Sequence, residues 1–327
     1  IDGLTSTLVA AFTTTQVKAL TTTQLAELST AQIGGLESTD IAVLSTAQLR
    51  GFGSGQITAL VTSQIVALTT AQISSLTTTQ FGGLESTDMG VLSTTQIKSI
   101  NSAQIKALTT TQLGGLESTD MASLTTAQIS ALTIEQISAL TTTLIGSLTG
   151  TQMDALSVTQ SAALGSISIA AMTKTQIGKL TKKRIEALTT TQVLALSTWQ
   201  IASFKPGEMG GLTTTQLSVL SFQQLNALTS DQFSNLTPQQ VGQGLTVTQI
   251  TGLTLTQVRA MTEKQMAALT MTQVGGLTDT ALGAMATTQL RSLSSSQLAA
   301  LSTTQVGGLV STQIGLLTTT QIKGVTV

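Results

Sequence analysis

Apolar residues recur at every eighth position along this chain. Counted from Leu4, the series runs unbroken to Leu236, resumes at Leu245 after one extra residue, and ends at Val325. We number each octad from this residue, which is position one. A second apolar residue stands at position six, with Ser161 as the one departure. The pattern predicts a single continuous octapeptide array over residues 1–327, with a one-residue register insertion near 242–244.

The residues between the apolar positions predict a short helix in each octad. Residues 188–195 are typical and read LTTTQVLA. A continuous α-helix would turn the apolar stripe by about 80° per octad, so the helix must be interrupted once per unit. Thr at position two and Gln at position five have the spacing of a capping box, and positions one and six have that of a hydrophobic staple. We therefore predict an all-α solenoid of short capped helices.

A β-solenoid is the alternative, because Thr and Ile favour strands and Thr is a mediocre helix former. Against it, alternation along a strand places positions one and six on opposite faces and leaves one of them exposed. If the fold were β, regular rows of Thr would form a flat face suited to binding ice or polysaccharide.

Gly-Gly pairs suggest the size of the coil. They precede Leu36, Leu84, Leu116, Leu212, Leu277 and Leu309. Once the inserted residue is removed, all their separations are multiples of 16. This spacing predicts about two octads per superhelical turn.

Both ends of the chain stay in the octad register, and neither shows the polar capping repeat that isolated solenoids need for solubility. We expect either that the chain is a segment of a longer one, or that its ends stack on other subunits.

The composition argues against a catalytic, metal-binding or cofactor-binding site. The net charge is −1 and the chain has no His or Cys, so thiolate metal sites and the usual nucleophile–base pairs are missing. No charge excess favours nucleic acid, and no uninterrupted apolar run of about 18 residues predicts a membrane span. We predict no catalytic, cofactor-binding or metal-ligating residue, no cofactor and no enzymatic activity.

One variant octad is acidic. The sequence Leu-Glu-Ser-Thr-Asp occurs three times and ends at Asp40, Asp88 and Asp120. Its two carboxylates are candidates for a Ca²⁺ site, which needs six to eight oxygens. The interpretation we favour is that Asp replaces Gln in the cap, near the positive end of a helix. Glu is a poor N-cap, so we expect Ser38, Ser86 and Ser118 to cap these helices.

Other departures from the repeat are local. The basic residues Lys179, Lys182, Lys183 and Arg184 are predicted to lie on a solvated face rather than in a partner site. Trp199, the sole Trp, is predicted to be surface variation rather than a binding platform. The segments 205–208 and 242–244, rich in Gly and Pro, are predicted to be kinks or bends.

Two resemblances follow from these residues. Residues 236–241, LTPQQV, resemble the opening of the first helix in transcription-activator-like effector repeats. That family's longer period and base-reading loop are absent, so no DNA-reading function carries over. Over its full length the chain resembles the Thr/Ser-rich short repeats of very large bacterial surface, adhesin or filament proteins. This resemblance is compositional and implies export and a cell-surface role.

The pattern as a whole predicts a structural protein, namely an extracellular fibre, a filament subunit or an adhesin stalk. We expect it to associate with itself end to end or laterally, and to be located outside the cell or at its surface. Hydroxyls and amides at positions two to five predict a hydrated, nearly neutral exterior that could carry glycans on Thr and Ser. An α-solenoid scaffold with a protein-binding groove is a further alternative, although it usually brings more charged and aromatic variation than this chain has.

Overall fold

The structure, a computed structural model, describes residues 3–325 and contains helices but no strand in that part of the chain. The predicted all-α solenoid of short helices is confirmed. The β-solenoid alternative is wrong, and with it the flat Thr face that was to bind ice or polysaccharide.

The chain divides into two compact units, Ile1–Leu164 and Gly165–Val327, and each is described by itself. The first unit contains α1 (Ser6–Ala10), α2 (Thr14–Ala19), α3 (Thr22–Ala26), α4 (Thr30–Ile33), α5 (Ser38–Val43), α6 (Thr46–Arg50), α7 (Ser54–Thr58), α8 (Thr62–Ala67), α9 (Thr70–Ser75), α10 (Thr78–Phe81), α11 (Ser86–Val91), α12 (Thr94–Ser99), α13 (Ser102–Ala107), α14 (Thr110–Gly114), α15 (Ser118–Ser123), α16 (Thr126–Ala131), α17 (Ile134–Ser138), α18 (Thr142–Ser147), α19 (Gly150–Ala155) and α20 (Val158–Ala162).

The second unit contains α21 (Ser166–Ala170), α22 (Lys174–Ile177), α23 (Lys182–Glu186), α24 (Thr190–Ala195), α25 (Thr198–Ile201), the 3₁₀ helix η1 (Pro206–Gly211), α26 (Thr214–Ser218), α27 (Phe222–Asn226), α28 (Ser230–Ser234), the π-helix η2 (Gln240–Gly244), α29 (Val247–Thr251), α30 (Leu255–Ala260), α31 (Glu263–Ala268), α32 (Met271–Gly275), α33 (Asp279–Ala284), α34 (Thr287–Arg291), α35 (Ser295–Leu298), α36 (Thr303–Gly307), α37 (Ser311–Ile314) and α38 (Thr319–Gly324).

Each helix is short because the backbone becomes extended at positions one and two. After α9, Leu76 has φ −56° and ψ 136°, and Thr77 has φ −66° and ψ 160°. Thr77 then caps α10 by accepting a hydrogen bond from the backbone N–H of Gln80. Each octad therefore forms one short helix and one bend, and the repeated bends make the chain coil.

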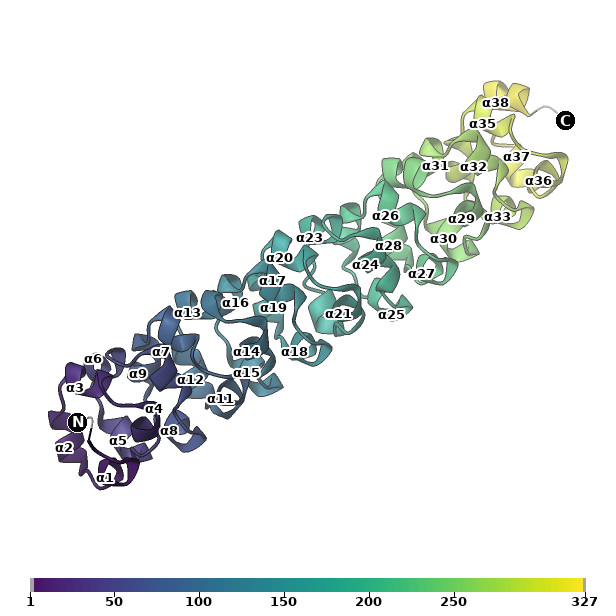
Figure 1. Cartoon of the computed structure of the whole chain (residues 1–327). Helices are drawn as coiled ribbons and strands as arrows, with labels where there is room; N and C mark the ends of the chain where they lie inside the picture. Colours follow the sequence, from purple (N-terminus) through teal and green to yellow (C-terminus); the bar gives the residue numbers. More distant parts are fainter. Residues whose placement is uncertain (1–2, 326–327) are drawn as a thin grey trace. The chain divides into compact units, whose positions relative to one another are not determined.

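The coil takes three octads per turn. Within each unit, every pair of elements that packs extensively lies three elements apart in sequence, as α5 does with α8 and α8 with α11. Figure 1 shows these three helices following one another through the first unit. The prediction of about two octads per turn is wrong, because the Gly-Gly spacing on which it rested reflects local contacts between turns rather than the period of the coil.

The core is built from positions one and six. In α9 and the bend after it, Ile73 is 0% exposed and Leu76 is 3% exposed. Leu and Ile from successive turns of the coil pack together, which supplies the main driving force for folding.

The two irregular segments coincide with the two elements that are not α-helices. Residues 205–208 lead into η1, with Pro206 at its first position. The inserted residue lies within η2, where the π-helix accommodates the extra residue between Val241 and Leu245. Proteins use π-helices mostly as such single turns.

Candidate functional site

The capping box predicted from the sequence forms in most octads. In α9, the backbone N–H of Gln72 donates to Thr69 Oγ1 over 3.2 Å, and the backbone N–H of Thr69 donates to Gln72 Oε1 over 2.7 Å. Two of the backbone donors left open at the start of a helix are thus satisfied, which confirms the predicted role of Thr and of the Gln carbonyl oxygen.

The other polar atom of the same Gln side chain reaches the preceding turn of the coil. Gln72 Nε2 donates to the backbone carbonyl oxygens of Ile41 at 2.7 Å and Leu44 at 2.8 Å, which lie 31 and 28 residues earlier. Leu44 is the position-one residue of the octad three before. The Gln side chain therefore closes its own helix and links it to the turn before.

We call the set of position-five Gln side chains that make this contact the glutamine ladder. In the first unit it begins where Gln32 Nε2 donates to Leu4 O at 2.7 Å, and it reaches Gln160, which donates to Leu132 O at 2.7 Å. In the second unit it extends from Gln200, bound to Met172 O, to Gln321, bound to Leu293 O.

The ladder is buried. Gln72 is 1% exposed, although Gln is a residue that usually lies at the surface. The prediction that positions two to five all form a hydrated exterior is therefore wrong at position five. The Gln amide can be buried because each of its polar atoms has a backbone partner, which offsets the cost of removing it from water.

The π-helix preserves the ladder across the inserted residue. Gln265 Nε2 donates to Phe233 O and Leu236 O, 32 and 29 residues earlier, instead of the usual 31 and 28. The extra residue therefore changes the sequence separation of the partners and leaves their contact intact.

The sequence carried a signal for the ladder that capping does not explain. Glu completes a capping box as well as Gln does. Position five is nevertheless Gln in 31 of 40 octads, and Glu only at Glu208. A carboxylate has no donor for the carbonyl oxygens of the preceding turn, whereas an amide has.

The acidic octads interrupt the ladder. The backbone N–H of Glu37 donates to Asp40 Oδ2 at 3.1 Å, and that of Glu85 donates to Asp88 Oδ2 at 2.8 Å. Asp thus replaces Gln in the cap, as predicted. Asp120 does the same with Glu117 at 3.0 Å.

The N-cap of these octads is the Glu and not the Ser that follows it. Glu37, Glu85 and Glu117 precede α5, α11 and α15, and none of them makes a side-chain cap hydrogen bond. The predicted caps Ser38, Ser86 and Ser118 are instead the first helical residues, because the octad register places position two at the cap. Among residues 3–325, no three His, Cys, Asp or Glu side chains gather in a way that could hold a metal ion.

Burial changes the acidity of two of these carboxyl groups. Desolvation raises the pKa of Asp40 and of Asp88 above that of an ordinary aspartate, the hydrogen bond from the cap N–H lowers it in part, and the neighbouring glutamate raises it further. Asp40 is 1% exposed. A negative charge at this position is therefore disfavoured by the fold.

The basic cluster is only partly solvated. Lys182 and Lys183 are exposed, as predicted, and Lys179 is half-buried. Arg184 occupies position five and is buried, so the prediction of a solvated face is wrong for this residue. Its Nη1 donates to Lys179 O at 3.2 Å. Trp199 lies at the surface, and 48% of this residue is exposed to solvent.

The Gly-Gly pairs mark close contacts between turns. A Cβ atom added to Gly83, at position eight, would lie 2.7 Å from the carbonyl oxygen of Ser54, and one added to Gly115 would lie 2.7 Å from the carbonyl carbon of Ser86. Both partners stand 29 residues earlier, on the preceding turn. Glycine is needed there for close backbone approach, and not for an unusual φ angle.

None of the helices in residues 3–325 is long and apolar enough to cross a membrane. No curated protein matches the chain. The leucine-rich repeat-containing protein LegL7 from Legionella pneumophila aligns over 75% of this chain and 77% of that chain, with 11% sequence identity and a TM-score of 0.18. A likeness at this level carries no argument.

Four segments match a known repeat family. Residues 33–70, 81–118, 113–150 and 280–311 match the ALTTAQ repeat. Together with the stacked capped helices, these matches show that the chain is a repeat protein with a helical solenoid fold.

Proposed function

We propose that this protein is a structural repeat protein without catalytic activity, which assembles end to end into an extracellular fibre, a filament or the stalk of an adhesin. The observation that supports this most directly is the glutamine ladder, in which buried side-chain amides link each turn of the coil to the turn before it. A regular coil of this kind can be extended by further turns, because each turn presents the same amide donors and carbonyl acceptors to its neighbours.

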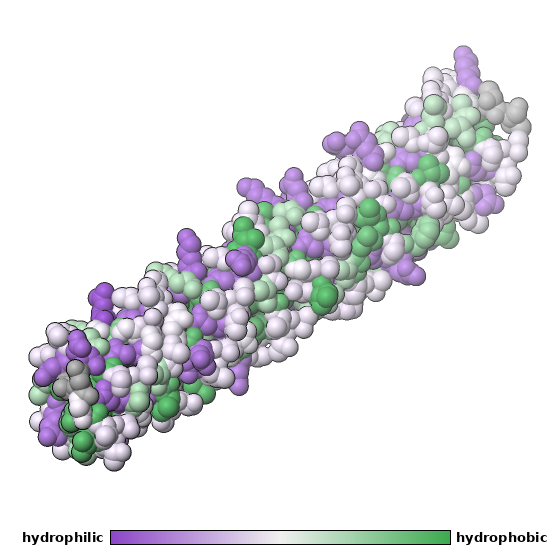
Figure 2. All heavy atoms as spheres, viewed as in Figure 1, coloured by the Kyte–Doolittle hydropathy of each residue, from purple (hydrophilic) through white to green (hydrophobic). Residues whose placement is uncertain are grey.

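The side surface suits exposure to water outside the cell. Positions two to four carry mostly exposed Thr and Ser, and Figure 2 shows a surface that is mainly pale, with separate hydrophilic and hydrophobic residues. The chain has no Cys that would depend on a reducing compartment. Labelling of intact cells with an antibody tests the location. The mass of the native protein tests for glycans on Thr and Ser.

Electron microscopy in negative stain, at two protein concentrations, tests the assembly. We expect filaments that lengthen with concentration. Short particles for the unchanged protein at both concentrations would overturn the proposal.

A further inference from the structure

Two links of the glutamine ladder are missing around α11, in the octad at residues 84–91. The position-five residue of this octad is Asp88, so no amide donates to Leu60 O, the position-one carbonyl oxygen 28 residues earlier. Among residues 3–325, no other group donates to Leu60 O either. On a residue that is only 5% exposed, a carbonyl oxygen is thus left without a hydrogen-bond donor below α11.

The second missing link concerns the C-terminal end of α11. Asp120 stands where a Gln would donate to Met89 O and Leu92 O, 31 and 28 residues earlier. After α12, the N–H of Ile100 donates to Ile97 O at 3.2 Å. After α11, the corresponding bond from Leu92 N–H to Met89 O is absent among the described residues. The helix end is therefore held less firmly where Asp replaces Gln on the following turn.

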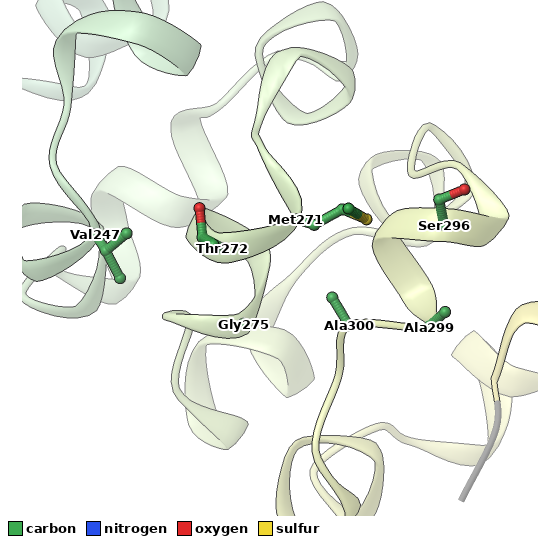
Figure 3. A pocket seen from close by; sticks show the side chains of 7 residues that line it. All are labelled: Val247, Met271, Thr272, Gly275, Ser296, Ala299 and Ala300. Atoms are coloured by element: carbon green, nitrogen blue, oxygen red, sulfur yellow. The ribbon is translucent and has the colours of Figure 1, made fainter.

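Position five places the two carboxyl groups inside the coil. In Figure 3, the side chains of Met271 and Thr272, at positions three and four of their octad, line a pocket at the surface. Gln273, the next residue, is 3% exposed. Asp88 and Asp120 stand at this inward position and are 7% and 4% exposed, so their ionisation depends on contacts within the fold.

The helices packed against α11 bring no charge to Asp88. They are α8 and α14, and neither contains Asp, Glu, Lys or Arg. The charged groups of the stacked octads are Glu85, in the same octad, and Glu117 and Asp120, in the octad after α14. Asp120 lies on α15, which packs against uncharged α18 and against α12, whose cation Lys98 is exposed. No cation on the packed helices therefore offsets a negative charge on Asp88.

Close packing of the turns compensates for the shorter side chain, since Asp has one methylene group fewer than Gln. Gly83, five residues before Asp88, lies so close to the preceding turn that an added Cβ atom would be 2.7 Å from the carbonyl oxygen of Ser54. Gly115 makes the same kind of contact five residues before Asp120. Both Asp residues therefore follow a point where the backbones of two turns touch.

Protonation gives Asp88 the donor that the ladder needs. Its Oδ2 atom accepts from Glu85 N–H at 2.8 Å, as the carbonyl oxygen of Gln would. A carboxylate has no proton for a carbonyl oxygen of the preceding turn, but a carboxylic acid has one O–H group. Burial raises the pKa of Asp88 above that of an ordinary aspartate, so the folded chain keeps this proton to a higher pH than the unfolded chain does.

We propose that the octad of α11 is joined to its neighbouring turns by a pair of links that close in acid, in which protonated Asp88 donates to Leu60 O and protonated Asp120 donates to Leu92 O. When the carboxyl groups are charged, both links are open and this octad opens more readily than a regular one. The Asp88 link is complete below the ordinary aspartate pKa of about 4 and is lost as pH rises through its raised pKa. This property belongs to a single chain and does not depend on assembly.

The protonation of Asp88 is read directly from the carbon resonance of its side-chain carboxyl group in the labelled full chain. Asp88→Asn removes this resonance and so assigns it. We expect a titration midpoint above the ordinary aspartate value of about 4. A midpoint at or below that value would overturn the proposal.

The closing of the links is tested by comparing the exchange of two backbone N–H groups, those of Met89 and Ile97, in one sample. Both donate to the carbonyl of a capping residue, and each rate is divided by the intrinsic rate of that N–H group at the same pH. Met89 should exchange at least about tenfold faster at about pH 7, and less than about threefold faster at about pH 3. A ratio that does not fall in acid would contradict the proposed links.

Two double variants of the full chain separate the buried carboxyl groups from the exposed ones. Asp88→Asn/Asp120→Asn has side chains of the same size that donate at every pH, so its exchange ratio should stay below about threefold at both pH values. Glu85→Gln/Glu117→Gln, the matched control, removes the exposed carboxyl groups of the same octads and should keep the dependence on pH. A dependence that persists in the Asn variant, or disappears in the Gln variant, would refute the assignment to Asp88 and Asp120.

Discussion

In the glutamine ladder, the two polar atoms of each Gln side chain bind different partners, one set within its own octad and one set on the preceding turn. The carbonyl oxygen of Gln104 accepts from Asn101 N–H at 2.8 Å, within its own octad. Its amide nitrogen donates to Ile73 O at 2.7 Å and Leu76 O at 2.8 Å, on the preceding turn. Local helix capping and long-range stacking thus depend on the same residue, and a change that spares one can remove the other.

Replacing Gln104 by Glu separates these tasks. The cap acceptor remains, but a buried carboxylate would face two carbonyl oxygens without a donor. We expect a loss of about 2–4 kcal/mol of stability, measured by chemical denaturation. Thr95→Glu is the control, because Thr95 is exposed, and it should change stability by less than about 0.5 kcal/mol. Equal effects of the two variants would contradict the role of the ladder.

Asp40 allows the opposite experiment, in which Gln is introduced at a position where the glutamine ladder is interrupted. The raised pKa means that the folded protein binds the Asp40 proton more tightly than the unfolded chain does. Stability therefore falls as pH rises from the ordinary aspartate pKa through the raised one, and the penalty is complete at neutral pH.

Asp40→Gln should thus raise stability at pH 7 by about 1–3 kcal/mol, through removal of the buried charge and gain of a hydrogen bond. The gain should be smaller below the ordinary aspartate pKa of about 4. Denaturation midpoints at both pH values measure it. Glu135→Gln, at an exposed site, is the control; a gain independent of pH would refute the explanation from burial.

At the scale of the element, the helices depend on their neighbours. A helix of four to six residues is far below the length that is stable alone in water. Capping lowers the cost of starting each helix, but packing against the element three octads away holds it in place. The contacts between turns therefore decide which substitutions a helix tolerates.

The Gly-Gly pair at Gly114 and Gly115 tests these contacts with matched variants. No atom lies within 4 Å of a Cβ added to Gly114, so Gly114→Ala should be neutral or stabilise the protein by up to about 1 kcal/mol. Gly115→Ala would push against the backbone of Ser86 and should cost about 1–3 kcal/mol. The difference between their thermal midpoints is the measurement, and a stable Gly115→Ala protein would refute close packing there.

The π-helix predicts an unusual tolerance to deletion. Removing Gln243 leaves Val-Gly-Gly-Leu, the sequence found at 274–277 and 306–309, and restores the octad register. We expect this deletion to change stability by less than about 1 kcal/mol. Deleting Thr95 from a regular octad shifts the register of α12 and should destabilise the first unit strongly. Circular dichroism during heating compares the two, and similar losses would mean that η2 does not absorb the insertion.

At the scale of the whole molecule, each unit is a stack in which a turn contacts only the turns before and after it. Such proteins are quasi-one-dimensional, and their stability is roughly a sum of repeat and interface contributions. A turn that lacks a hydrogen-bond link to the turn before it should open more often than a turn that has the link.

Hydrogen exchange measures this difference. The N–H of Met89, whose octad has Asp88 in place of Gln, should exchange at least about tenfold faster than that of Ile97, whose octad has the Gln96 link to Leu68 O. Both donate to the carbonyl of a capping residue, Glu85 and Ser93, so their local bonding is alike. Equal protection would show that the unit opens as a single cooperative body.

The amino-acid sequence by itself determined the octad, its helix and its cap. Thr and Gln three residues apart, flanked by apolar residues, specify a local structure whose hydrogen bonds close within six residues. This is why α9 could be predicted from residues 68–75 alone. The extra residue at 242–244 was equally visible, since a break in an otherwise regular period needs no knowledge of the fold.

The tertiary structure decided how many octads make a turn and what Gln does with its amide. Both depend on the angle between successive helices, which arises from the packing of Leu and Ile across turns and leaves no period in the sequence. The Gly-Gly spacing pointed to two octads because it records where backbones touch, and Gln72 was expected in water because its partners, Ile41 and Leu44, are brought to it only when three octads have closed a turn.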